Sequence, residues 1–339
     1  MPIIAGVDLG GTAVNYTLLD FEGRFLIDGL CEHPARSVEG PEVCLQQIED
    51  GLAIAARTAG VELGEIVVVG LDTPGPASAT GVLSARGSTN FVHAAWAGFD
   101  LPAALSAKLG RPVTYLNDGN AGALWGHVSI FGADKHKTSI SAIVGTGLGG
   151  GVIVNDQVVK GRDGFGGELG HVLLPYHDLP GLEGATPRCN CGRIGDLESV
   201  CSLTAIRNLL LPHFLARHPG HELGALPVAD AAKRVRGRAE AGDVMCREIF
   251  QVQARALGLF FDQMVNVFDP DALIVGGGAI EASAVFQRWF VAEIRAGMPA
   301  QRAEQADIPI HLMPNGDSAG ARGAALDALT FARTSTFVS

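Results

Sequence analysis

Short apolar runs that end in glycine recur along the chain, and two stretches share the same order of runs. The first stretch has runs over residues 3–10, 13–20 and 25–30, separated by glycines and turn residues. The second stretch, over residues 138–161, again places an apolar run, a glycine loop and a second apolar run in succession. Each stretch therefore predicts an antiparallel β-meander.

Longer periodic segments surround the two meanders. Uninterrupted apolar runs predict buried strands, and apolar residues spaced three and four apart predict helices. The expected strands are 65–72, 112–118 and 271–276, and the expected helices are 41–59, 119–130, 229–235, 243–266, 283–296 and 317–332. We interpret this order as two related α/β domains that face each other across a cleft. The predicted domains are residues 1–118 with about 315–335, and residues 119–314.

Bulk composition excludes several classes of protein. The chain has 339 residues, of which 47% are hydrophobic, and a formal net charge of -11. Its arginines are scattered, so no basic patch indicates nucleic-acid binding. No apolar run is long enough to span a membrane, and the first residues do not form a signal peptide. Six cysteines in a chain of this length favour a reducing, cytoplasmic location.

Glycine loops are the first candidates for chemistry, because bare backbone N–H groups can approach a phosphate closely. The loop at 145–150 matches a dinucleotide-binding pattern, but a strand rather than a helix follows it, so we reject that interpretation. The alternative is that glycine only permits tight hairpins. A carboxylate at the mouth of the first loop could hold Mg²⁺. The candidate phosphate- and nucleotide-binding residues are Asp8, Gly10, Gly11, Thr12, Gly145, Thr146, Gly147, Gly276, Gly277 and Gly278.

A series of motifs resembles the ROK family of bacterial sugar kinases and sugar-sensing repressors. In order, they read GVDLGGT, GLDTPGP, YLNDGNAGA, GTGLGGG, GGELGH, CNCG, DLES and DSAGARGAA, and they cover nearly the whole chain. The resemblance implies a two-domain actin-like ATPase (ribonuclease H-like) fold with duplicated mixed sheets. The resemblance starts at the first strand, so we expect no DNA-binding helix-turn-helix of the kind that the repressors carry.

The resemblance also implies the roles of residues around a sugar. Asp118 would accept the proton of the attacking hydroxyl. The helix N-terminus that follows should keep its carboxylate ionised, although the same position could merely cap a helix. The residues expected to bind the sugar, together with Asp118, are Gly75, Asn90, Asn117, Glu168, His171 and Glu198.

A metal site is expected beside the sugar. In the family, one histidine and three cysteines hold zinc, and three of the four positions match His171, Cys189 and Cys191. Asp196 occupies the fourth position, and a carboxylate is an acceptable zinc ligand. His177 and Cys201 are possible substitutes, and the alternative is a turn with free thiols.

These features together predict an ATP-dependent hexokinase-type enzyme that uses Mg²⁺ and carries structural zinc. Glucose, phosphorylated at the 6-hydroxyl, is the first expectation for the substrate. An N-acetylhexosamine or fructose kinase, or a non-catalytic sugar sensor, is the alternative. The resemblance also implies a homodimer.

Overall fold

Two five-stranded mixed sheets form the framework of the protein. The computed structural model describes residues 1–86, 90–299 and 302–335. The first sheet has the order β3-β2-β1-β4-β5, with β1 Ile3–Leu9, β2 Ala13–Asp20, β3 Cys31–Pro34, β4 Ile66–Thr73 and β5 Val113–Asn117. The second has the order β10-β9-β6-β7-β8, with β6 Ser139–Val144, β7 Leu148–Val154, β8 Gln157–Val158, β9 Ala272–Gly276 and β10 Ile310–Leu312.

The two sheets repeat one topology. In each, the first three strands along the chain form an antiparallel meander, because β1 pairs with β2 and β2 with β3, as β6 pairs with β7 and β7 with β8. Two later strands extend each sheet in parallel on the other side of the first strand: β4 pairs with β1 and β5 with β4, as β9 pairs with β6 and β10 with β9. The predicted duplication of mixed sheets is therefore confirmed.

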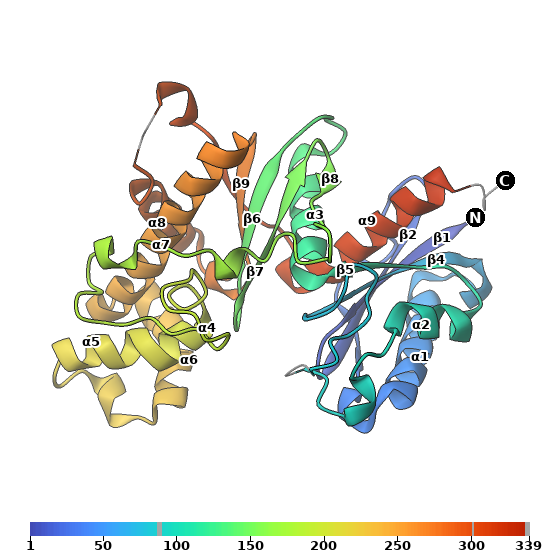
Figure 1. Cartoon of the computed structure of the whole chain (residues 1–339), viewed down its shortest axis with the longest axis horizontal. Coiled ribbons are helices and arrows are strands. Elements are labelled where there is room, and N and C mark those ends of the chain that lie inside the picture. The colour runs from blue at the N-terminus through green and yellow to red at the C-terminus, as the bar shows by residue number, and fades with distance from the viewer. Residues whose placement is uncertain (87–89, 300–301, 336–339) are drawn as a thin grey trace.

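Helices cover the sheets and fill the space between them (Figure 1). Their bounds are α1 Pro41–Ala59, α2 Leu101–Leu109, α3 Asp118–Phe131, α4 Leu203–Ala205, α5 Leu211–Arg217, α6 Val228–Glu240, α7 Val244–Phe268, α8 Ala284–Ala296 and α9 Ala319–Thr334. The first helix starts with Pro41 and ends at Gly60, whose φ of 71° lies in the left-handed region. Both residues occupy the positions that suit them at helix ends.

Helices α3 and α9 lie side by side between the two sheets (Figure 1). Small residues allow this close approach: a Cβ added to Gly323 of α9 would lie 1.7 Å from the Ala121 carbonyl oxygen of α3. The C-terminal helix also packs on the first sheet, where a Cβ on Gly6 of β1 would lie 1.9 Å from the Ala321 carbonyl oxygen. The predicted small-residue helix thus returns from the end of the chain to the first sheet.

The third strand of the first meander lies later in the chain than expected. The run over 25–30 was predicted as a strand, but Phe25 makes only an isolated bridge with Leu19. The Phe25 ring instead packs edge-on against Trp125 of α3, at 5.5 Å between centroids, and below Arg322 of α9. Pairing with β2 stops after the Leu26 N–H donates to the Leu18 carbonyl at 2.8 Å, and the strand that completes the meander forms at Cys31–Pro34.

Within the part of the chain that the structure describes, none of the helices has the length and apolar character needed to cross a membrane.

Candidate functional site

The first glycine loop is a tight turn between β1 and β2. The Gly10 N–H donates to the Ala13 carbonyl at 2.9 Å, and the Gly11 carbonyl accepts from the Ser37 hydroxyl at 2.5 Å. Asp8 precedes the turn and is half-buried, whereas Thr12 is exposed at its tip.

The second glycine loop joins β6 to β7 in the same way. The Gly145 N–H donates to the Gly147 carbonyl at 2.9 Å. The Thr146 carbonyl accepts from both the backbone N–H and the hydroxyl of Thr204, at 3.1 and 2.7 Å, which fixes the loop to the start of α4. The two loops therefore occupy equivalent places in the duplicated topology.

The third glycine turn follows β9 and has less open backbone than the sequence indicated. A Cβ on Gly276 would lie 3.1 Å from the Met313 sulfur, and one on Gly277 would lie 2.4 Å from the Val144 carbonyl oxygen. These two glycines are thus needed for packing. Gly278 is more open, and its carbonyl accepts from Arg236 at 2.6 Å.

Asp118 is the first residue of α3, directly after β5. Asn117, rather than Asp118, caps the helix, because its side-chain oxygen accepts from the Asn120 N–H at 2.8 Å. The Asp118 side chain is exposed, and one carboxylate oxygen accepts from the Gly119 N–H at 2.7 Å. The capping role is therefore filled by a neighbour, which leaves the carboxylate available to a substrate.

The surroundings raise the pKa of Asp118 to about 6. Desolvation by the neighbouring protein is the main cause, and the negative charges of Asp8 and Glu168 add to it. The sequence predicted that the positive end of the α3 helix dipole would keep this pKa low, but desolvation and the two negative charges outweigh that effect. Because solvent reaches the Asp118 side chain in this structure, we expect its pKa to rise fully to this value only when a bound substrate covers it.

Several predicted sugar-binding residues meet near Asp118. The Asn117 amide donates to Glu168 Oε1 at 3.3 Å, and a Cβ on Gly75 would lie 4.0 Å from the same oxygen. Asn90 lies instead beside the first glycine loop, where its Oδ1 is 3.3 Å from a Cβ added to Gly11.

Glu198 connects two parts of the site. Its backbone N–H donates to the Gly170 carbonyl at 2.8 Å, which places it beside the Glu168–His171 segment. Its Oε2 accepts from the Leu148 N–H at 2.8 Å, in the second glycine loop. The resemblance assigned this carboxylate to sugar hydroxyls, whereas here one of its oxygens already supports the loop.

Four side chains form a compact cluster that matches the predicted metal ligands. His171, Cys189, Cys191 and Asp196 each offer one ligand atom, and these atoms lie within 4.8 Å of one another. His171 Nδ1 is 3.1 Å from Asp196 Oδ2 and 3.9 Å from Cys189 Sγ, and Cys191 Sγ is 3.5 Å from Asp196 Oδ2.

These spacings are within about 1 Å of those in a tetrahedral zinc site, so small side-chain movements would let the four atoms bind one ion. Zinc bonds to nitrogen, oxygen and sulfur imply about 3.3 to 3.8 Å between ligand atoms at the corners of a tetrahedron. Burial alone would raise the pKa of Asp196, but hydrogen bonds from His171, a cysteine thiol and the Ser199 N–H together lower it. Burial raises the pKa of the Cys189 thiol, so a metal ion would be needed to hold it as thiolate.

The two substitute ligands considered from the sequence lie outside the cluster. Cys201 is buried, and its thiol contacts the Gln253 carbonyl at 3.6 Å. His177 lies against the Tyr176 ring, at 4.0 Å between centroids. Asp196 is therefore the residue that completes the set.

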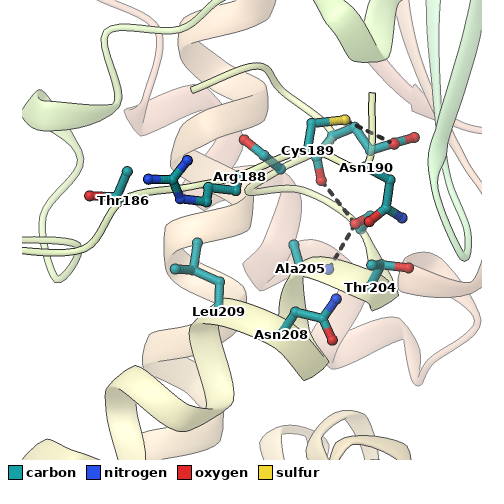
Figure 2. Close-up of a pocket in the computed structure, with 11 residues that line it drawn as sticks. Thr186, Arg188, Cys189, Asn190, Thr204, Ala205, Asn208 and Leu209 are labelled. Carbon is teal, nitrogen blue, oxygen red and sulfur yellow. Dashed lines mark hydrogen bonds between the residues drawn. The ribbon is translucent and has the colours of Figure 1, made fainter. Parts of the chain in front are cut away.

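A pocket of about 300 Å³ opens beside this cluster. Figure 2 shows that one wall comes from the segment from Thr186 to Asn190 and the other from the helical turns from Thr204 to Leu209. The labelled lining residues are Thr186, Arg188, Cys189, Asn190, Thr204, Ala205, Asn208 and Leu209. Because Glu198 also lines it, the pocket adjoins the candidate site.

Two polar residues near Asp8 were missed from the sequence. Asp72 of β4 is fully buried, and its pKa is raised well above the ordinary value by burial and by the charges of Asp8 and Asp118. Asn15 of β2 donates to Asp8 Oδ2 at 3.3 Å. The sequence signal that could have identified Asp72 is its position as an acidic residue at the end of the apolar run IVVVGLD.

Comparisons with known proteins agree with this geometry. A protein-family model described as the ROK family matches residues 4–330. The glucokinase of Thermotoga maritima is 31% identical over 293 residues, which cover 83% of this chain and 84% of that protein. The N-acetyl-D-glucosamine kinase of Pectobacterium carotovorum is 28% identical over 326 residues, covering 95% and 97%.

A solved structure shares the architecture. It is a ROK family glucokinase from Streptomyces griseus in complex with glucose and AMPPNP, with a TM-score of 0.72 and 26% identity over 97% of this chain and 99% of that one. The expected actin-like ATPase fold is therefore confirmed.

Proposed function

The chain belongs to the ROK family, and from that premise we propose that it is an ATP-dependent kinase that phosphorylates glucose at the 6-hydroxyl. The observation that carries the proposal is the position of Asp118. Its carboxylate stands at the start of α3, where Asn117 supplies the helix cap, and it is close enough to Asp8 and Glu168 for both charges to raise its pKa. A proton acceptor thus lies near both a loop suited to phosphate and residues suited to a sugar.

Asp118 would orient the sugar hydroxyl and take its proton. The hydroxyl oxygen attacks the terminal phosphorus of ATP, the bond from that phosphorus to the bridging oxygen breaks, and ADP leaves. A loose transition state needs alignment of the nucleophile more than strong basicity. A carboxylate with a pKa near 6 is ionised at neutral pH and still basic enough to accept the proton late.

The two glycine loops would hold the phosphates of ATP. Their exposed tips, Thr12 and Thr146, can add hydroxyl donors to the backbone N–H groups. Mg²⁺ bound beside Asp8 would neutralise part of the phosphate charge. Gly278, the open residue of the third turn, is where we place the edge of the adenine, and this assignment excludes Gly276 because Met313 covers it.

The sugar would lie against Asn117 and Glu168, whose contact shows that the two elements meet. Carboxylate and amide oxygens accept from hydroxyls and can discriminate their arrangement. Gly75, Asn90 and Glu198 would complete the binding surface, with Glu198 offering Oε1, which in this structure accepts from the Cys189 thiol at 3.4 Å.

Zinc would act as a structural ion in this scheme. It would hold the segment from His171 to Asp196 in place, and Glu198 follows that segment by two residues. Because His171 Nδ1 faces the cluster, the other ring nitrogen would remain as an N–H donor toward the sugar.

A second candidate substrate class is an N-acetylhexosamine. The support is the N-acetyl-D-glucosamine kinase similar to this chain over 95% of its length. Fructose and a purely sensory role are further alternatives, and some family members are regulators rather than enzymes.

An ADP-release assay with a sugar panel separates these possibilities. We expect glucose-dependent ADP formation that Asp118→Asn lowers by at least about 100-fold, while calorimetry shows that the variant still binds glucose. Higher kcat/KM with an N-acetylhexosamine than with glucose would move the proposal to the second class. Binding of a hexose without turnover by the wild type would contradict a kinase and favour the sensor. The proposed homodimer is tested separately by light scattering, where a monomer mass would exclude it.

A further inference from the structure

The chain between β8 and Glu168, called the 159–167 loop from here on, is a compact loop that extends from the second sheet. At its start, the Val159 N–H donates to a carbonyl of β7 at 2.9 Å. The Gly166 N–H then donates back to the Lys160 carbonyl, also at 2.9 Å, so the two ends of the loop are joined. Because Glu168 follows this closing hydrogen bond by two residues, the position of the loop base helps to determine where the Glu168 backbone lies.

One side chain ties the base of the 159–167 loop to the first sheet. The Lys160 ammonium donates to the Tyr115 carbonyl of β5 at 3.4 Å and to Asp327 Oδ1 of α9 at 3.3 Å. Both partners belong to the half of the molecule that is built on the first sheet, because α9 packs on β1 and β4. The segment that follows β8 therefore crosses from the second sheet to β5 (Figure 1).

The ion pair between Lys160 and Asp327 joins two parts of the chain that are otherwise not linked by charge. In the part of the chain that the structure describes, no other ion pair connects residues 1–118 or 315–335 with residues 119–314. Lys160 is thus placed to fix the loop against the first half of the molecule.

Two uncharged contacts hold the rest of the 159–167 loop. At its tip, a Cβ added to Gly164 would lie 2.4 Å from the Ala79 backbone nitrogen, and the φ of Gly164 is 89°, in the left-handed region. A residue with a side chain therefore cannot take this place without moving the tip. Closer to the base, the Gly166 carbonyl accepts from the Asn120 amide of α3 at 2.9 Å. The contact of Lys160 is the charged one of this set.

We propose that Lys160 is a positioning residue for Glu168, and that its contacts with Asp327 and Tyr115 keep the 159–167 loop where the Glu168 carboxylate can bind a sugar. The inference rests on the proposed function, because it takes Glu168 as a sugar ligand. Without the ammonium, the loop base would occupy additional positions. A sugar that binds only one of these positions then binds more weakly, in proportion to the fraction of molecules that remain in it. The glycine loops that would hold ATP are separate from this loop, so ATP binding should not change.

The test compares Lys160→Met, which keeps an unbranched apolar side chain, with Lys160→Arg, which restores the charge. Lys160→Met should raise the glucose Kd, measured by calorimetry, and the KM for glucose by about three- to tenfold, and leave the KM for ATP unchanged. Lys160→Arg should recover most of the loss. Asp327→Asn should act in the same direction, and adding it to Lys160→Met should have little further effect, because both changes remove the same pair.

Lys137→Met is the matched control. Lys137 pairs with Asp271 at 3.2 Å, and its side chain is 31% exposed compared with 40% for Lys160, but both of its atoms in the pair lie in the half built on the second sheet. This variant should leave the glucose affinity unchanged. Salt gives a second readout, because glucose itself is uncharged. Higher ionic strength should weaken glucose binding by the wild type and by Lys137→Met, and should have no effect on Lys160→Met.

Hydrogen–deuterium exchange without sugar or nucleotide follows the loop directly. Amides in peptides that cover residues 159–168, including the Gly166 N–H, should exchange faster in Lys160→Met than in the wild type or in Lys137→Met. Unchanged exchange in these peptides would overturn the inference, as would an unchanged glucose affinity in Lys160→Met or an equal rise of the KM values for glucose and ATP. The exchange experiment needs no substrate, whereas absence of ADP formation by the wild type with any sugar would contradict the kinase proposal. The two failures are therefore distinguishable.

Discussion

The pH dependence of phosphoryl transfer tests the role of Asp118 most directly. The proposed base works only when it is ionised, and its surroundings raise its pKa from 3.8 to about 6. For a carboxyl group with a raised pKa, the ionised form is lost as the pH falls through the raised value. Activity should therefore decline on the acidic side well before an ordinary aspartate would protonate.

The size of the decline follows from the two pKa values. With a pKa of about 6, about 90% of Asp118 is ionised at pH 7 and about 10% at pH 5, so kcat should fall roughly tenfold. With the ordinary value of 3.8, more than about 90% would still be ionised at pH 5, and kcat would hardly change. The two cases differ by close to an order of magnitude.

The assay measures kcat at saturating glucose, ATP and Mg²⁺ from pH 5 to 8, because kcat reports the pKa in the substrate complex. Glu168→Gln removes one of the negative charges that raise the pKa and should move the acidic midpoint to lower pH. Glu22→Gln is the control, since this exposed acid pairs with Arg24 in the turn after β2, at the opposite end of that strand from the first glycine loop. A flat profile down to pH 5, with the protein still folded there, would refute a base with a raised pKa.

Two further predictions concern the metal cluster and the contact between α3 and α9. The Asp196→Ala variant should contain no zinc by elemental analysis, and its KM for sugar should rise far more than its KM for ATP. The Asp196→Cys variant should bind zinc more tightly than the wild type. Equal effects of Asp196→Ala on both KM values would exclude a role of the cluster in positioning the sugar-binding residues. Gly323→Ala would force a Cβ to within 1.7 Å of the Ala121 carbonyl oxygen and should lower the free energy of unfolding by about 3 kcal/mol or more, measured with urea. Gly237→Ala, in the middle of α6 with no atom within 4 Å of the added Cβ, should instead raise it by about 0.5–1 kcal/mol.

Patterns that repeat along a single element were readable from the sequence. The apolar positions of α1, with Pro41 at its start and Gly60 after its end, give the helix that the structure has. The buried strand β4 followed from its continuous apolar run. The third strand was misplaced because Phe25 makes only an isolated bridge with β2, while its ring packs against Trp125, 100 residues away along the chain, a contact that local sequence does not reveal.

The candidate site was only partly readable, for the same reason. Motif order brought His171, Cys189, Cys191 and Asp196 into one hypothesis, and the structure brings their ligand atoms together. Spacing could not reveal that Glu198 turns one oxygen to the Leu148 N–H. That direction depends on the pairing of the 170–172 and 197–198 segments, which is a tertiary feature.

Asp72 shows what strand register adds to a sequence motif. On its own, an aspartate in GLDTPGP is one acid at the end of an apolar run. Once β4 is aligned beside β1, Asp72 stands next to Asp8, and once β2 is aligned on the other side, Asn15 completes a row of polar side chains. Gly320, nearly 250 residues beyond Asp72 along the chain, then provides the space in which both carboxylates fit. Burial and the neighbouring charges of Asp8 and Asp118 then raise the pKa of Asp72 well above its ordinary value, a consequence of strand register that no single motif could reveal.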